Sequence, residues 1–230
     1  MKADLLLLHG ALSSKLQFNS LLPLLESKYT VHTLNFSGHG GEPIPLSGYT
    51  FDTFANDILT YLDKHNLKAI HLFGYSMGGY AALYFATLHP QRVKSIVTLN
   101  TKFNWDPLST AKETALLNAE KMMEKVPAFA NNLMMQHGMN LWKQVLKSTE
   151  DMMNKLVEHV QLTDEVLNNI KSRVTVCVGD RDQTASIREN LSVYEKLPNA
   201  GFCVLPNTGH PFEKVDLSLM SSLIQKQCID

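Results

Sequence analysis

The sequence predicts an α/β fold in which a mostly parallel, six-stranded sheet is covered by helices on both faces. Short apolar runs alternate along the chain with longer stretches whose apolar residues recur at helical spacing. The apolar runs are nearly continuous, which is typical of strands buried on both faces. This regular succession of strand and helix favours a doubly wound sheet with right-handed crossovers.

Six segments bounded by turn-forming residues are expected to be strands: residues 5–9, 29–35, 69–75, 93–100, 173–178 and 201–205. Between them, five segments have apolar residues at helical spacing: residues 16–25, 51–66, 77–89, 187–197 and 216–227. Asn66 and the His89-Pro90 pair are expected helix stops.

Residues 101–170 interrupt this alternation because they contain no convincing strand. Helices are expected there at residues 111–125, 141–159 and 163–170, with Pro127 and Gly138 as breaks. A chain of 230 residues has room for one domain with a small insertion. We therefore interpret residues 1–100 and 171–230 as one core, and residues 101–170 as an inserted helical cap.

Composition excludes several classes of protein. The net charge is −1, without the clustered Lys and Arg on which nucleic-acid affinity rests. The apolar run at residues 5–8 is too short for a signal peptide or a membrane span. Three cysteines, Cys177, Cys203 and Cys228, form neither a disulfide framework nor a zinc-binding pattern. We expect a soluble, cytoplasmic protein without a metal or another cofactor.

The sharpest local motif is Gly74-Tyr75-Ser76-Met77-Gly78, which is followed by Gly79. It matches G-x-S-x-G between an expected strand and an expected helix, the context that this motif requires. A serine hydroxyl is a weak nucleophile and has to project from a tight turn, which small neighbouring residues allow. Ser76 is therefore the candidate nucleophile.

A serine nucleophile needs a base, and the base needs an orienting acid. His210 follows the last expected strand and Gly209, in a loop where an imidazole can reach the serine. Asp180 and Asp182 both follow the strand at residues 173–178. One is expected to face the site and the other to serve the turn, and these residues alone leave the choice open.

The oxyanion of a tetrahedral intermediate needs preorganised donors. One expected donor is the N–H of Met77, which follows the nucleophile and begins a helix. The second is expected from the turn after the first strand, His9-Gly10-Ala11, and the N–H of Ala11 is the candidate.

Together these residues resemble the α/β-hydrolase superfamily over nearly the whole chain. The matching motifs follow the family's order: His9-Gly10, Gly38-His39-Gly40, Gly74–Gly79, Gly179–Asp182 and Gly209-His210. The resemblance implies the α/β-hydrolase fold with a cap over the active site. It also implies that Asp182 is the acid, since family members usually carry it three residues after the strand-ending glycine.

The turn around the candidate nucleophile, Gly74–Gly79, which we call the elbow, is similar to those of small carboxylesterases and of the menaquinone-pathway synthase that eliminates pyruvate. That synthase usually has Arg after the double glycine, where this chain has Tyr80, which weakens the second likeness. Ser76 disfavours the branches that use an aspartate nucleophile. Only residues 1–4 precede the first strand, so we expect a six-stranded sheet without the family's leading hairpin. Asn35 stands where many relatives have Asp, and we expect it to alter local hydrogen bonding.

Seven of the ten methionines fall between Met122 and Met153, and both tryptophans, Trp105 and Trp142, lie in the same insertion. Methionine is flexible and lines adaptable apolar pockets. The methionines therefore either line a lid over an apolar acyl or aromatic substrate, or fill the core of the cap itself. Both interpretations stay open at this point.

The sequence as a whole predicts a serine hydrolase that cleaves an ester or a related activated carbonyl of a small molecule through an acyl-enzyme on Ser76. His210 is the expected base and Asp182 the expected acid. Elimination or acyl transfer on the same triad is an alternative, and a small-ligand receptor on this fold is another. Three other histidines, His32, His39 and His71, are interpreted as structural.

Overall fold

The computed structural model describes residues 2–229 and contains one six-stranded sheet in which every neighbouring pair of strands is parallel. The strand order is β2-β1-β3-β4-β5-β6. The strands are β1 (Ala3–Leu8), β2 (Tyr29–Thr33), β3 (Ile70–Tyr75), β4 (Val93–Leu99), β5 (Arg173–Gly179) and β6 (Ala200–Leu205). The predicted α/β fold with six parallel strands is confirmed.

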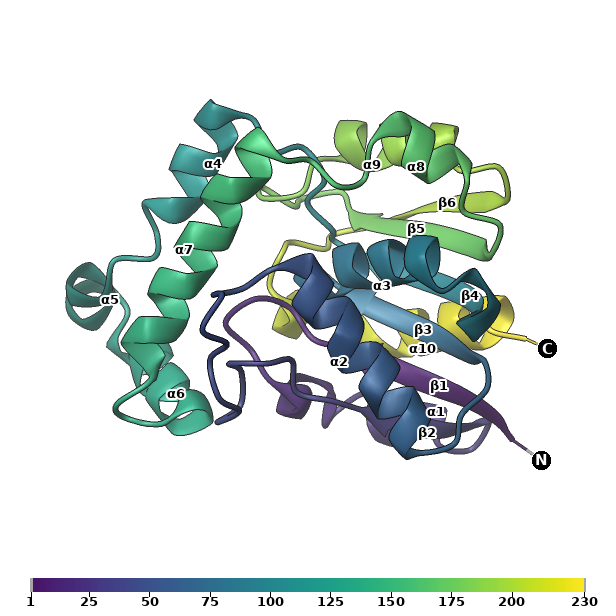
Figure 1. Ribbon diagram of the computed structural model, residues 1–230, viewed down its shortest axis with the longest axis horizontal. Coiled ribbons are helices and arrows are strands. Elements are labelled where there is room, and N and C mark those ends of the chain that lie inside the picture. Colours follow the sequence, from purple (N-terminus) through teal and green to yellow (C-terminus); the bar gives the residue numbers. More distant parts are fainter. Residues whose placement is uncertain (1, 230) are drawn as a thin grey trace.

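Helices cover both faces of this sheet, as Figure 1 shows for α2 and α3 in front and α10 behind. The helices of the front layer are α2 (Phe51–Lys64), α3 (Met77–Leu88), α8 (Asp164–Asn168) and α9 (Ile187–Lys196). Those of the back layer are α1 (Leu22–Leu25) and α10 (Leu217–Gln227), with the 3₁₀ turns η1 (Lys15–Phe18) and η3 (Phe212–Lys214). A third 3₁₀ turn, η2 (Pro90–Arg92), precedes β4.

The alternation of side chains along β1 explains why the sheet has two cores. Leu6 and Leu8 pack with α2 and α3 in one buried cluster. Leu5 and Leu7 point to the opposite face and pack with α1 and α10. All four leucines are fully buried, so this strand is apolar throughout, as a central parallel strand should be.

Residues between β4 and β5 form α4 (Pro107–Thr114), α5 (Ala119–Lys125), α6 (Pro127–His137) and α7 (Trp142–Glu158), followed by α8. Figure 1 shows α4 to α7 beside the sheet, on the side where the strands end, whereas α8 lies next to α9 over the sheet. Within residues 2–229, no helix has the length and apolar character needed to cross a membrane.

Two local expectations in the insertion are wrong. A single helix over residues 111–125 is replaced by α4 and α5, because Asn118 caps a new helix by accepting from the N–H of Lys121. The helix α6 was not expected, since Pro127 marks its first turn rather than a break. Gly138 does end α6, with φ +91° at its C-cap.

The expected helix over residues 16–25 is also wrong. The segment divides into η1 and α1, and Pro23 lies in the first turn of α1. Proline lacks the N–H that a continuous helix would need at this position, whereas the first turn of a new helix does not need it. The other predicted helices and strands lie at their predicted positions, with small shifts at the ends.

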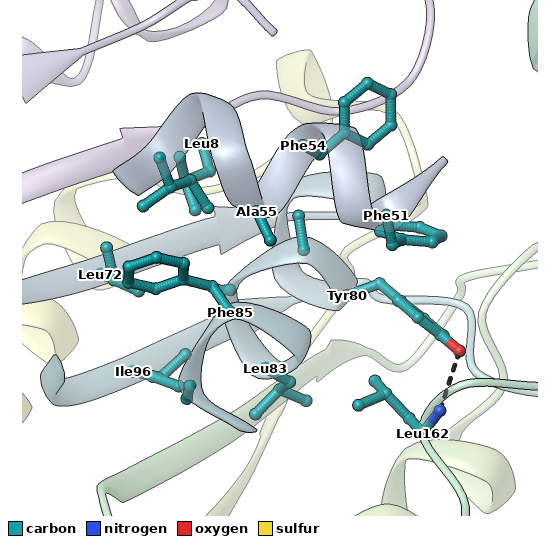
Figure 2. Close-up of a cluster of buried hydrophobic side chains, with 14 of the residues drawn as sticks. Leu8, Phe51, Phe54, Ala55, Leu72, Tyr80, Leu83, Phe85, Ile96 and Leu162 are labelled. Carbon is teal, nitrogen blue, oxygen red and sulfur yellow. Dashed lines mark hydrogen bonds between the residues drawn. The ribbon is translucent and has the colours of Figure 1, made fainter. Parts of the chain in front are cut away.

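Tyr80, which follows the double glycine, lies in the front core rather than at the surface. Its ring packs against Phe51 with centroids 4.2 Å apart. Figure 2 shows its hydroxyl oxygen accepting the N–H of Leu162, at 3.2 Å, just before α8. Burial raises the pKa of Tyr80, so this hydroxyl stays neutral. Tyr80 thus joins α3 to the end of the insertion.

We predict that Tyr80→Phe lowers the free energy of unfolding by about 1–3 kcal/mol, because the buried N–H of Leu162 loses its acceptor. Urea unfolding followed by circular dichroism measures this change. Tyr84→Phe, on the same helix, is the matched control because the Tyr84 hydroxyl donates to exposed Asp52. Equal losses in the two variants would contradict this role of Tyr80.

Candidate active site

Ser76 lies at the turn between β3 and α3 in a strained backbone conformation, with φ +51° and ψ −117°. Few residues other than glycine adopt positive φ, so the surrounding structure has to hold this turn. Its N–H donates to the carbonyl of Leu99, at 2.8 Å, on the neighbouring strand β4. Its carbonyl accepts from Gly79 in the first turn of α3.

Two glycines allow α3 to begin this close to the sheet. A Cβ on Gly78 would overlap the backbone carbonyl of Leu8 at the end of β1. A Cβ on Gly74 would overlap the carbonyl of Gly78 itself. The spacing of the motif therefore reflects backbone packing on both sides of Ser76.

Three predicted residues from distant parts of the chain meet at this turn. The Ser76 hydroxyl lies 3.3 Å from His210 Nε2. His210 Nδ1 lies 2.8 Å from Asp182 Oδ2. The other oxygen of Asp182 accepts the N–H groups of Thr184 and Ala185, each at 2.8 Å. A carboxylate can only accept a hydrogen bond, so His210 Nδ1 carries the proton and donates it to Asp182. The other ring nitrogen, Nε2, is then free to accept from the Ser76 hydroxyl.

The two candidate acids have different positions. Asp182 has a fully buried side chain in contact with His210. Asp180 is exposed and accepts the N–H of Thr208 at 3.0 Å, in the loop that carries the histidine. Hydrogen bonds from backbone N–H groups of Asn207 and Thr208 lower the pKa of Asp180. The structure thus brings Asp182 to His210, while Asp180 holds the loop.

The loop of His210 has two further anchors that the sequence analysis missed. The Tyr75 hydroxyl donates to the carbonyl of His210 at 2.6 Å. Asn100, directly after β4, donates through Nδ2 to the carbonyl of Gly209 at 2.9 Å and accepts the N–H of Gly179 at 2.8 Å. An asparagine at the end of a buried strand was the signal available, but its partners are about a hundred residues away.

The turn after β1 contains the other candidate oxyanion donor. Ser13 N–H donates to the carbonyl of Gly10 across it, and Leu12 has φ +59°. Among the hydrogen bonds of the described residues, neither Ala11 N–H nor Met77 N–H has an acceptor. Both residues line the same cavity as Ser76. Two residues of the cavity wall thus have backbone N–H groups without a hydrogen-bond acceptor in the described residues.

A helix of the insertion holds this turn in place. His137, at the end of α6, donates from Nε2 to the carbonyl of Leu12 at 3.2 Å. Its Nδ1 accepts the N–H of Gly40 at 3.0 Å, which requires a neutral ring. The adjacent Gln136 accepts from the Ser14 hydroxyl at 2.7 Å. Neither residue of α6 was predicted from the sequence to contact the site.

Two more buried histidines, His9 and His39, lie near the turn after β1, and both are neutral. His9 accepts the N–H of Phe36 and donates to the carbonyl of Gly10. Burial lowers the pKa of His9 to about 4. His39 donates to the carbonyl of Ser37, in agreement with its predicted structural role, and burial lowers its pKa as well. These rings form a packed row with His137, at centroid distances of 5.1 and 5.9 Å.

Structural roles also fit the histidines predicted on strands. His32 contacts Asp4 and Tyr61, and His71 contacts the Ser95 hydroxyl at 2.8 Å. Asn35 bonds locally, accepting from the N–H of Lys15 and donating to the carbonyl of Gly40. Within residues 2–229, no group of three or more His, Cys, Asp and Glu side chains is arranged to hold a metal ion.

A cavity of about 1100 Å³ extends from Ser76 and His210 under the insertion. Each of α4 to α7 contributes lining residues, including Phe129 of α6. The methionines divide between the two predicted roles. Met122, Met152 and Met153 line the cavity, and the first two also pack in hydrophobic clusters. Met135 and Met139 are exposed and do neither.

The fold and this arrangement define a member of the α/β hydrolase fold family. A family model described as alpha/beta hydrolase fold matches residues 5–165, more than half of the chain. The chain therefore belongs to this family.

Two curated relatives are similar to this chain over short stretches. A serine hydrolase-like protein from Danio rerio is 34% identical over 98 residues, 42% of this chain and 30% of that protein. A pimeloyl-[acyl-carrier protein] methyl ester esterase from Aeromonas hydrophila is 33% identical over 99 residues, 42% of this chain and 37% of that protein. The matches span about a third of these relatives' length.

Solved structures share the fold over nearly the full chain. The 2-hydroxy-6-oxo-6-phenylhexa-2,4-dienoate hydrolase from Rhodococcus sp. strain RHA1 superimposes with a TM-score of 0.82. It covers 98% of this chain and 90% of that chain at 17% sequence identity. At this identity the likeness establishes the fold alone.

The buried histidines predict a loss of stability on acidification. The unfolded chain binds a proton at His9 below pH 6.5, whereas the folded protein excludes it until about pH 4. The free energy of unfolding should therefore decline as the pH falls through this window, by about 3 kcal/mol for His9. His39 and His137, whose pKa values are also lowered, add to the decline.

Urea unfolding at a series of pH values measures this dependence. His65→Gln is the control, because His65 is exposed and lies outside the buried row. That variant should keep the slope of the parent protein. An unfolding free energy that stays constant between pH 6.5 and pH 4 would contradict the neutral, buried state of these histidines.

Proposed function

We propose that the protein is a serine esterase that cleaves a carboxylic ester, or a related activated carbonyl, through an acyl-enzyme on Ser76. One observation carries this proposal: the chain of contacts from the Ser76 hydroxyl to His210 and from His210 to buried Asp182. This order of nucleophile, base and orienting acid is the arrangement that activates a serine.

In the proposed mechanism, Ser76 Oγ attacks the ester carbonyl while His210 Nε2 accepts its proton. Asp182 keeps the proton of His210 on Nδ1 and stabilises the imidazolium that forms. The N–H groups of Ala11 and Met77 donate to the developing oxyanion. Losing one such donor costs about 3–4 kcal/mol of transition-state stabilisation in serine hydrolases.

Collapse of the tetrahedral intermediate breaks the ester C–O bond, and the alcohol leaves with the proton from His210. A water molecule then attacks the acyl-enzyme, with His210 again as the base. Collapse of the second intermediate releases the acid and restores the Ser76 hydroxyl. The protons and bonds balance without a cofactor.

We further propose that residues 101–170 form a cap that selects the substrate. Four of its helices line the cavity, and α6 is bonded to the turn that contains Ala11 and Leu12. The cavity wall is largely apolar, which favours an apolar acyl or aromatic part in the substrate. One of the relatives is named as a methyl ester esterase, which supports ester cleavage as the reaction class.

We predict that the protein hydrolyses p-nitrophenyl esters and that Ser76→Ala lowers kcat/KM by about 10⁴-fold or more. Release of p-nitrophenol from a panel of acyl lengths measures both quantities, and the best length indicates the size of the pocket. Ser13→Ala is the matched control, because Ser13 lines the cavity without contacting His210. It should retain most of the activity.

Two outcomes would redirect this proposal. Equal turnover by the parent protein and Ser76→Ala would exclude Ser76 as the nucleophile. Absence of turnover in both, with Ser76 still reactive toward a fluorophosphonate, would favour elimination, acyl transfer or ligand reception on the same residues.

We predict different effects on kcat/KM when each of the two aspartates is replaced by asparagine. Asp182→Asn should lower kcat/KM by about 10⁴-fold, because the amide favours the wrong tautomer of His210. Asp180→Asn should leave activity within a few-fold, because the amide oxygen still accepts the N–H of Thr208. The same ester assay compares them. A larger loss in Asp180→Asn than in Asp182→Asn would contradict the assignment of the acid.

A further inference from the structure

Lys102 lies on the loop that follows β4, at the same edge of the sheet as the candidate nucleophile. β3 and β4 are neighbours, and the carbonyl of Leu99, at the end of β4, accepts the N–H of Ser76. The loop therefore starts beside the elbow. Lys102 follows three residues after that carbonyl.

The backbone on both sides of Lys102 is fixed by α9. The carbonyl of Thr101 accepts from Asn190 Nδ2 at 3.1 Å. The N–H of Phe103 donates to Glu189 Oε1 at 2.8 Å. The residues on either side of Lys102 are therefore both hydrogen-bonded to side chains of α9. Its side chain is consequently presented by a rigid loop.

The Lys102 side chain is buried without an ionic partner. The residue is only 7% exposed. Among residues 2–229, no carboxylate lies within 4 Å of its Nζ and no acceptor is hydrogen-bonded to it. The contact that it does make is with the ring of Trp105, whose centroid is 5.3 Å from Nζ. Lysine is rarely buried to this extent unless it is paired.

Lys102 and Trp105 both line the cavity that contains Ser76. The indole Nε1 of Trp105 is buried and has no acceptor within the described residues. Of the other charged side chains at the cavity, Arg181, Glu213 and Lys214 are exposed, and Glu113 of α4 is half-buried and forms no ion pair with Lys102 among the described residues. Trp105 thus meets the cavity through its ring, and Lys102 is the buried cation of the cavity wall, without an ion pair or hydrogen bond in the described residues.

An unpaired buried ammonium is unfavourable, and an anion that enters the cavity would relieve this penalty. A single ammonium in an apolar wall matches the single charge of a carboxylate, whereas a phosphate is usually held by more donors or by an arginine fork. We propose that Lys102 binds a substrate carboxylate, so that the preferred ester carries a carboxylate beyond an apolar segment. This inference rests on the proposed esterase function.

The experiment compares two series of p-nitrophenyl esters of increasing chain length. In one series the acyl chain ends in a carboxylate, and in the other it ends in the neutral carboxamide of the same size. We expect kcat/KM for the carboxylate to exceed that for the carboxamide by about 10- to 100-fold at the best length. Lys102→Met should bring this ratio close to one, and Lys102→Arg should restore most of it.

Lys214→Met is the matched control, since it removes an exposed cation from the same cavity, and it should keep the ratio of the parent protein. A ratio near one in the parent protein at every length would overturn the inference. So would a ratio that survives in Lys102→Met, even if both substrates then react more slowly, because Lys102 would then act only on packing.

Turnover of the carboxamide series tests the esterase proposal separately. If neither series is turned over, equilibrium dialysis with radiolabelled suberate measures carboxylate binding directly. Binding that Lys102→Met weakens at least tenfold would support the carboxylate site while the esterase proposal fails. Equal binding by the two proteins, or none by either, would overturn the carboxylate site.

Discussion

The close approach of α3 to the ends of β1 and β3 is the constraint on which the rest of the site depends. Gly78 lies so close to the carbonyl of Leu8 that the Cβ atom of any other residue would overlap it. This packing holds Ser76 at positive φ, directly before the first turn of α3. The core leucines of β1 supply the burial that keeps the strands in place.

The remaining groups are attached to this edge of the sheet by a small number of polar side chains. Asn100 connects the end of β4 to the end of β5 and to the loop of His210. His137 connects the insertion to the turn after β1. Because each bond joins segments far apart in the chain, geometry at the serine depends on the complete fold, including α6.

Much of this architecture could be predicted from the sequence, since the strands are continuous apolar runs and the elbow motif has a fixed local context. The motif order also indicated where His210 and Asp182 lie relative to Ser76. The start of α6 could not be predicted, because Pro127 is compatible with either the end or the first turn of a helix.

Asn100, His137 and Lys102 were missed for a different reason. Their partners and their burial arise from tertiary packing, which no local sequence pattern reveals. The sequence does show that Lys102 is a charged residue just beyond a buried strand. Its lack of a carboxylate partner becomes visible only in the folded protein.

The most direct test of this account is to find where an activated phosphonate reacts. The protein is treated with a fluorophosphonate, digested, and examined by mass spectrometry, beside Ser76→Ala and His210→Gln. We expect one adduct per chain, on the peptide that contains Ser76, with none in Ser76→Ala and much slower formation in His210→Gln. An adduct on another residue, or equal labelling of all three proteins, would contradict the proposal that His210 activates Ser76.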